Sequence, residues 1–249
     1  MNNNKKASFF KERAEELNQL YQILYKHFKE NAELSSLMKA SKELEMLAYG
    51  NGTPECWGYK IENLVLPVGD VRNTKPSGVL WRMQIECSCQ SIVENYNKRC
   101  DPFTSYSFRL QVYGDYEGMR YSWCMHIDRD SPDDSDEWHP LYHLHCFDGR
   151  GNMRDALRDE KINRGMMYLN VPRLVHYPMD IVLAIGFCLM NFYKKEEFNK
   201  LYNQDMMFPR LYKKSRERIL EPFFAAIVGN RGEKIQGWSE RKELCPQIV

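Results

Sequence analysis

The densest group of reactive side chains is the segment His139-Pro-Leu-Tyr-His143-Leu-His145, which holds three of the six histidines in the chain. In a β-strand alternate residues point to one face, so His139, His143 and His145 would share a side. Two neutral imidazoles on one strand face can bind a divalent metal when a third ligand is near. The segment therefore predicts a catalytic or metal site built on these three histidines.

A neighbouring strand is expected to supply the missing ligand. His126 and Asp128 stand at the end of the predicted strand 119–128, which precedes the histidine segment along the chain. If the two strands pair, His126 or Asp128 comes close to His143 and His145. These four residues are the predicted metal ligands, and the predicted cofactor is a divalent metal. The competing interpretation is that the histidines are structural or surface residues of a half-exposed strand.

A His-hydrophobic-His element on a strand is also the metal-binding half of HUH endonucleases, which nick or resolve single-stranded DNA. The other half of such a site is a tyrosine nucleophile on a downstream helix. Tyr193 and Tyr212, each followed by two lysines, are the candidates here. Their spacing is not specific, so this is a narrower version of the metal-dependent nuclease hypothesis.

A proline-bounded segment, residues 170–180, is a second candidate site because it carries Arg173 and His176. Pro172 and Pro178 restrict the backbone on either side, and a helix is expected to begin at the end of the segment. Because a helix N-terminus favours an anion, Arg173 and His176 are predicted to bind a phosphate or a carboxylate. The alternative is an ordinary connection between a strand and a helix.

Charge is distributed unevenly, although the whole chain has a net charge of only +1. Residues 210–242 contain nine lysines and arginines against four glutamates, whereas residues 128–137 contain six acidic residues and one arginine. Basic patches bind nucleic acid, but many are solvated helix faces, and the acidic loop could instead dock on the basic segment. The predicted anion or nucleic-acid contacts here are Lys213, Lys214, Arg216 and Arg218.

The eight cysteines are scattered, most of them in apolar runs, and no Cys-x-x-Cys pair occurs. We interpret them as reduced thiols that pack as small hydrophobic side chains. Cys87 and Cys89 fall on one face of a predicted strand, which is a weak metal pattern. Cys124 and Cys146 are candidates to lie near His143, where a thiol beside an imidazole could act as a nucleophile, but nothing in the sequence selects one cysteine.

Helices are predicted at both ends of the chain. Residues 7–30 repeat apolar side chains at spacings of three and four, and a second helix covers residues 34–48. This pair is either a hairpin packed on the core or an arm that binds a partner. Near the C-terminus we expect a buried helix that ends near Tyr193 and is too short to cross a membrane, followed by helices near 195–203 and 209–228.

Between these helices the pattern changes to a period of two. Short loops between consecutive strands imply antiparallel pairing. The predicted fold class is α+β, with an antiparallel sheet of about four or five strands covered by N-terminal and C-terminal helices. The predicted strands are 79–91, 105–113, 119–128, 138–147 and 166–171, and residues 56–78 are predicted to be irregular.

One core domain is expected beside the N-terminal helices. Residues 1–52 form the hairpin or arm, and residues 53–249 form the α+β domain, with a loosely ordered tail at 229–249. Hydrophobic residues make up 43% of the chain, which is enough for a packed core. The polar start of the chain has no feature of a secretory signal, so we expect a cytoplasmic protein that does not bind membranes.

The two histidine-bearing segments together support a resemblance. Trp138-His139-Pro140-Leu-Tyr-His143-Leu-His145 and Val171-Pro172-Arg173-Leu-Val-His176-Tyr-Pro178-Met-Asp180 resemble segments of uncharacterised bacterial proteins encoded in mobile or antiphage-defence loci. The resemblance covers residues 138–193. It implies a biological context and carries no catalytic assignment.

Two functions are consistent with these patterns. The first is an accessory or partner-binding subunit of a bacterial defence or toxin–antitoxin-like system, which would hold a protein partner and could contact nucleic acid. The alternative is a metal-dependent nuclease or phosphoesterase built on His139, His143 and His145. Self-assembly of the chain into a homo-oligomer is a third expectation.

Overall fold

The computed structural model describes residues 3–50, 54–68, 78–95, 100–130, 140–147, 174–204, 206–228 and 244–245. Within them, six strands form one sheet in the order β1-β2-β3-β4-β5-β6, and every neighbouring pair is antiparallel. The sheet confirms the predicted α+β class and has more strands than expected. Its members are β1 (Cys56–Pro67), β2 (Arg82–Ile92), β3 (Ser105–Tyr116), β4 (Met119–Arg129), β5 (Tyr142–Phe147) and β6 (Leu174–Val175).

The prediction of an irregular segment at residues 56–78 is wrong for its first half, because β1 pairs with β2 along its length. The register shifts between Ile61 and Leu64, and Asn63 has a positive φ of 54°. A bulge of this kind adds residues to one strand and shifts its alternation. The period of two is thus interrupted inside β1, which hides the strand in the sequence. The predicted strand 166–171 and most of the predicted tail lie outside the described residues.

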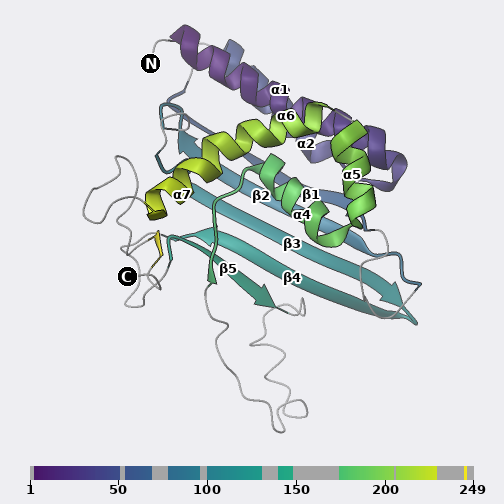
Figure 1. The fold of residues 1–249 in the computed structure, drawn as a ribbon. Coiled ribbons are helices and arrows are strands. Elements are labelled where there is room, and N and C mark those ends of the chain that lie inside the picture. The colour runs from purple at the N-terminus through teal and green to yellow at the C-terminus, as the bar shows by residue number, and fades with distance from the viewer. Residues whose placement is uncertain are drawn as a thin grey trace.

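The described helices lie together on one side of the sheet (Figure 1). α4 is the apolar helix expected in the core, and it is buried from Ile181 to Gly186. Among the described residues, no helix has the length and apolar character needed to span a bilayer. The helices are α1 (Asn3–Phe28), α2 (Ser35–Tyr49), α4 (Ile181–Phe192), α5 (Lys195–Gln204), α6 (Met207–Ser215) and α7 (Glu221–Val228), with a π-helical segment at Arg216–Leu220 between the last two.

Alternation along the strands separates an apolar face from a polar one. Towards the helices, β2 and β3 bury residues such as Ile85, Cys87 and Leu110. We call this side the helical face and the other side the open face, because no described helix packs on it (Figure 1). The open face of β2 and β3 carries exposed or half-buried polar side chains, among them Gln84, Glu86, Ser88, Ser107, Arg109 and Gln111.

The N-terminal hairpin belongs to the core and does not project as an arm. Phe10, Leu24 and Leu37 are fully buried in the same hydrophobic cluster as the sheet. α2 packs against β1, and the turn between α1 and α2 adds a backbone bridge from Glu33 to Val65 at the edge of the sheet. The spacing of apolar residues in α1 therefore reflects burial against the rest of the molecule.

A buried group of charges connects the two ends of the chain. Arg218, in the π-helical segment, donates from both terminal nitrogens to the Glu16 carboxylate of α1 at 3.2 Å, and from one of them to Asp180 Oδ2 at 3.1 Å. Asp180 is the N-cap of α4 and accepts a hydrogen bond from the Leu183 amide. The three charged side chains are at most 12% exposed. One guanidinium thus fixes α1, α4 and the C-terminal helices relative to one another.

Replacing Arg218 by methionine is expected to lower the free energy of unfolding by about 3–5 kcal/mol, because Asp180 and Glu16 would stay buried after losing this guanidinium. Glu16 would keep its ion pair with Arg13 at 2.8 Å, so most of the loss is expected to come from Asp180. Lys213→Met is the matched control: its ammonium is exposed and lies 3.6 Å from Glu217, so its loss should cost less than about 1 kcal/mol. Urea unfolding followed by circular dichroism measures both. Equal losses in the two variants would show that the buried network contributes nothing beyond a surface pair.

Candidate functional site

The pairing of β4 with β5 brings three histidines to one place on the open face. In the register, His126 lies opposite His145, and Asp128 lies opposite His143. Antiparallel partners point to the same face, so all four side chains leave the sheet on the side away from the helices. Four residues predicted as a group are therefore neighbours in the folded chain.

The three imidazole rings form one continuous contact, which we call the imidazole cluster (His126, His143 and His145). The rings of His126 and His145 stack with centroids 4.6 Å apart and planes inclined by 16°. The rings of His143 and His145 meet edge to face at 4.7 Å. The third member is thus His126 of the neighbouring strand, whereas His139 lies outside the described residues.

Asp128 orients the exposed end of the cluster. Its Oδ2 lies 3.0 Å from Nε2 of His126, and because a carboxylate only accepts hydrogen bonds, Nε2 carries the proton and Nδ1 is the basic nitrogen. Burial raises the pKa of Asp128, but hydrogen bonds from His126 and Ser107 and the nearby imidazoles of His126 and His143 outweigh it and lower the pKa overall. Asp128 is therefore an anion at neutral pH.

His143 is the buried end of the cluster. Its side chain is 4% exposed, whereas that of His126 is 27% exposed. Nδ1 of His143 lies 3.1 Å from the Pro140 carbonyl oxygen and 3.7 Å from Asp130 Oδ2. Since both oxygens accept, Nδ1 carries the proton and Nε2 is the basic nitrogen. His143 holds a fixed orientation against His145.

The predicted metal ligands meet without forming a coordination shell. In the part of the chain that the structure describes, no three histidine, cysteine or acidic side chains are arranged to hold a metal ion. Nε2 of His126 is turned towards Asp128, and Nδ1 of His143 towards Pro140. Hydrogen bonds of this kind fix the orientation of an imidazole, and they are compatible with proton transfer by its other ring nitrogen.

Arg109 is a site residue that the sequence patterns do not mark. It pairs in register with His126 on one side and with Glu86 on the other, so Glu86, Arg109, His126 and His145 form a row across four strands. Its side chain is exposed on the open face. An outward arginine in an amphipathic strand has no distinctive sequence signal, and only the register places it beside the imidazole cluster.

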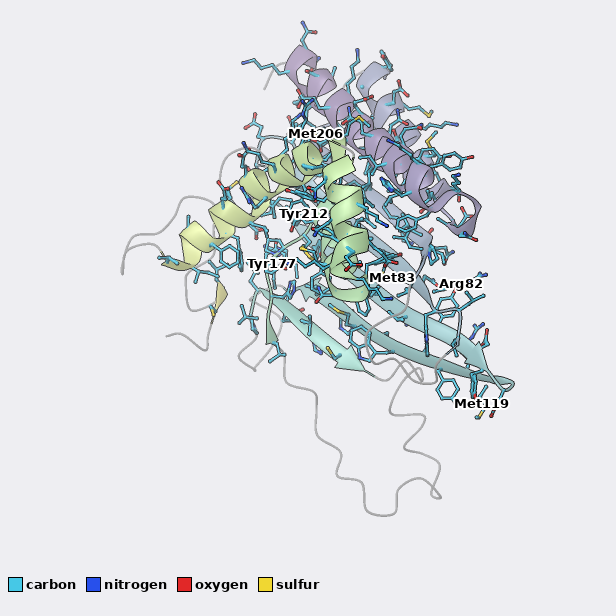
Figure 2. The ribbon with its side chains drawn as sticks, turned by 45° about the vertical axis from the view of Figure 1, so that its right-hand side comes forward. Arg82, Met83, Met119, Tyr177, Met206 and Tyr212 are labelled. Atoms are coloured by element: carbon cyan, nitrogen blue, oxygen red, sulfur yellow. The ribbon has the colours of Figure 1, made fainter. Side chains whose placement is uncertain are left out.

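The two tyrosines proposed as nucleophiles lie on the wrong side of the sheet. The Tyr193 hydroxyl donates a hydrogen bond to the Pro67 carbonyl, and burial raises its pKa. Tyr212 packs on Gly186 of α4, among the helices (Figure 2). The sheet separates both hydroxyls from His143 and His145, so the arrangement expected of an HUH endonuclease does not occur.

The predicted anion site before α4 is already filled by a side chain of the protein. Asp180 accepts from the Leu183 amide, and the Ile181 amide donates to the Tyr59 hydroxyl. The His176 ring packs against the tilted ring of Tyr177 and meets the ring of Phe187 edge to face. Arg173 lies outside the described residues. The helix N-terminus thus binds an internal carboxylate, which Arg218 neutralises.

The basic C-terminal helices are only partly available to a ligand. Lys213 and Arg216 are exposed but lie near Glu217 and Glu221, each at 3.6 Å, and Lys214 is exposed. The prediction that Arg218 binds an external anion or nucleic acid is wrong, because its side chain is buried in the network with Glu16 and Asp180. Most of the acidic loop lies outside the described residues.

All eight cysteines are in the thiol form. Cys87 and Cys89 face the helices, and burial raises the pKa of Cys89 to about 12, so both are inert packing residues as expected. Cys146 pairs in register with Met125 on the helical face and therefore points away from His143. Cys124 shares the open face with His126 but is 1% exposed. No reactive thiol–imidazole pair is accessible among them.

No known protein family matches this chain, and no curated protein or solved structure matches it either. The resemblance to proteins of defence loci therefore gains no support and stays a prediction. The chemistry of the site rests on its own geometry.

The environment of His176 generates a test of the fold in acid. Burial lowers the pKa of His176 from its ordinary 6.5, although a hydrogen bond with the Tyr177 carbonyl opposes the shift. As the pH is lowered through 6.5, the imidazole of the unfolded chain binds a proton while that of the folded chain stays neutral. The free energy of unfolding therefore decreases as the pH decreases, until the pKa of His176 in the folded chain is reached. His176→Gln should lose less melting temperature than the wild type between about pH 7.5 and pH 5.5. Differential scanning calorimetry measures these melting temperatures. An equal loss of melting temperature in the wild type and in His176→Gln would contradict a lowered pKa for His176.

Proposed function

We propose that the protein cleaves phosphoester bonds by general acid–base catalysis at the imidazole cluster. The observation that carries the proposal is the contact of three imidazole rings beside the ionised Asp128, on a face that no described helix covers. Imidazole is the side chain most often used to transfer protons near neutral pH. The proposal retains the predicted phosphoesterase class and replaces the predicted metal with proton transfer.

Repulsion between the rings lets one cluster supply both an acid and a base. With ring centroids 4.6 and 4.7 Å apart, protonation of one imidazole disfavours protonation of its neighbour. The proposed reaction starts with a single proton on the cluster, so that one ring is the imidazolium acid and another is the neutral base. The negative charge of Asp128 compensates this proton.

Accessibility divides the roles among the residues. His126 and the half-buried His145 are within reach of a substrate, whereas the buried His143 is a positioning residue that acts through its contact with His145. Arg109 supports a phosphoester as the substrate class, because a guanidinium offers paired donors that match phosphate oxygens. Its position in the row beside His126 would place the phosphorus next to the acid and the base.

The central test uses bis(4-nitrophenyl) phosphate, whose activated leaving group lets water serve as the nucleophile. The wild-type protein should release nitrophenol in the presence of a chelator, with a bell-shaped dependence of kcat/KM on pH. His126→Asn should lower kcat/KM by about 100-fold or more, because a positioned general acid or base contributes about 10²–10⁴.

His176→Asn is the matched control for that measurement. It removes an imidazole of similar partial burial from the helical face, so it should leave kcat/KM unchanged. A His126→Asn variant that is as active as the His176→Asn variant would refute the assignment of the cluster as the acid–base site.

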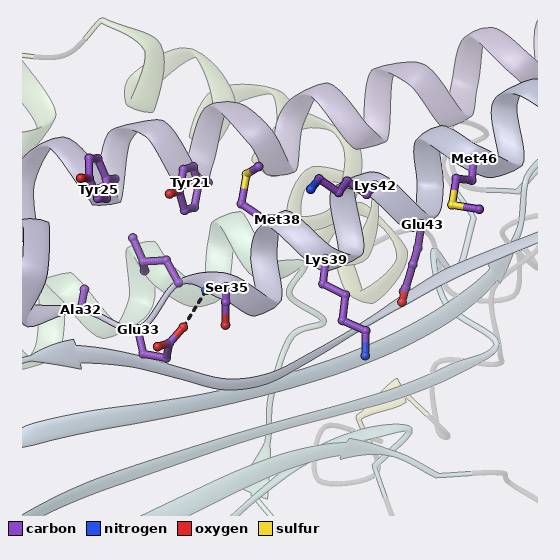
Figure 3. Close-up of a pocket in the computed structure, with 11 residues that line it drawn as sticks. Tyr21, Tyr25, Ala32, Glu33, Ser35, Met38, Lys39, Lys42, Glu43 and Met46 are labelled. Atoms are coloured by element: carbon purple, nitrogen blue, oxygen red, sulfur yellow. Dashed lines mark hydrogen bonds between the residues drawn. The ribbon is translucent and has the colours of Figure 1, made fainter.

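A second function, an accessory subunit that binds a protein partner, is favoured by a groove between α1 and α2 (Figure 3). The groove has a volume of about 650 Å³. Tyr21 and Tyr25 of α1 form one wall, and Met38, Lys42 and Met46 of α2 form the other. The side chain of Met46 is 73% exposed, so its apolar surface is available for contact with another molecule.

The occupant that suits this groove is an amphipathic helix of another protein. Grooves between helices bind the apolar face of such a helix, and methionine side chains adapt to the shape of the bound residues. Lys39 and Lys42 on α2 would meet acidic residues flanking the apolar face. In a bacterial defence or toxin–antitoxin-like system, this partner would be the protein that the subunit recruits or restrains.

A photoreactive phenylalanine analogue at position 46 should crosslink to one partner in the native host, whereas the same residue at Leu80, which is also exposed, should not. The decisive result is binary binding of the two purified proteins. Met46→Glu is expected to weaken it about tenfold or more, because it places a charge in an apolar contact. Affinity that is unchanged in Met46→Glu would exclude the groove as the interface.

A further inference from the structure

We infer that the substrate is RNA, cleaved by attack of its own 2′-hydroxyl on the adjacent phosphate. This inference rests on the proposed phosphoesterase function and names its substrate class. It is derived from what the open face supplies near the imidazole cluster and from how much rate enhancement those groups provide.

The described part of the open face offers proton transfer but no oriented nucleophile. Ser107, opposite Asp128 in the register, gives its hydroxyl hydrogen bond to that carboxylate and not to an imidazole. Cys124 is buried, and the tyrosines discussed above lie on the helical face. The other sources of the attacking oxygen are water and the substrate.

Magnitudes favour the substrate as the source. A general acid and a general base each raise the reaction rate by about 10²–10⁴-fold. Attack of water on an unactivated phosphodiester needs a much larger acceleration than this. A nucleophile held in the same molecule as the reacting centre has an effective molarity of about 10⁵–10⁸ M. A ribose 2′-hydroxyl next to the phosphate provides this advantage, and deoxyribose does not.

The row across the sheet suits one phosphodiester. Neighbouring strands are about 4.8 Å apart, so Arg109 and His145 flank His126 at about 10 Å from each other. A phosphate above His126 would meet the Arg109 guanidinium on one side and the His145 ring on the other. Glu86 at the end of this row and Asp128 beside it disfavour a long polyanion, which limits recognition to one or two phosphates.

The reaction balances without a further reactant. The neutral imidazole takes the proton of the 2′-hydroxyl while the 2′-oxygen forms a bond to phosphorus. The bond from phosphorus to the 5′-oxygen breaks, and the imidazolium gives its proton to that oxygen. The products are a 2′,3′-cyclic phosphate and a 5′-hydroxyl end. The two imidazoles have then exchanged protonation states, and proton exchange with solvent restores them.

The experiment compares an RNA oligonucleotide with an all-deoxy oligonucleotide of the same sequence, in chelator, with bis(4-nitrophenyl) phosphate run in parallel. The wild-type protein should cut the RNA and leave 2′,3′-cyclic phosphate ends that mass spectrometry identifies, while the deoxy strand stays intact. His126→Asn should reduce the RNA cleavage rate by about 100-fold or more. His176→Asn, purified in the same way, should cut at the wild-type rate. A contaminating nuclease would cut equally in all three preparations, so the loss in His126→Asn alone excludes it.

The contrary outcomes separate the two proposals. Hydrolysis of bis(4-nitrophenyl) phosphate that depends on His126, with intact RNA, overturns the inference on RNA and leaves the phosphoesterase function in place. Equal cleavage of the RNA and deoxy strands overturns the 2′-hydroxyl as the nucleophile. Failure to act on any of the three substrates overturns both proposals.

Discussion

The hydrogen bonds of Arg218 to Glu16 and Asp180 are the constraint on which the arrangement of the molecule depends. Burying three charges is costly unless each is paired and its hydrogen bonds are satisfied. Asp180 meets that condition twice, because it also caps α4 through the Leu183 amide. As a result the first helix, the central apolar helix and the last helices are fixed to one another on the same face of the sheet (Figure 1).

Placing the described helices on one face leaves the other to polar side chains. A strand alternates between the two faces, so β3 and β4, which bury Leu110 and Ile127 on the helical face, present Arg109 and His126 on the open face. The imidazole cluster exists because β4 and β5 pair in a register that stacks His126 on His145. A shift of β5 by one residue would turn His143 and His145 towards the core and separate them from His126.

Local patterns predicted the fold class and the main elements because they depend on short-range periodicity. The apolar residues of α1 at spacings of three and four, and the alternation along β2 to β4, predicted these elements correctly. β1 was not, because the bulge near Asn63 interrupts its period. Cys87 and Cys89 were correctly interpreted as packing residues, since apolar neighbours on one strand face imply burial.

The sequence by itself determined that His143 and His145 share a face, that the protein is α+β and that α4 is buried, because each follows from periodicity within one segment. Only the tertiary structure decided that His126 completes the imidazole cluster, that Arg109 lies beside it and that Arg218 is internal. These depend on strand register and on contacts between residues as far apart as Glu16 and Arg218. Such pairings are chosen by the packing and charge balance of the whole chain, which no local pattern contains.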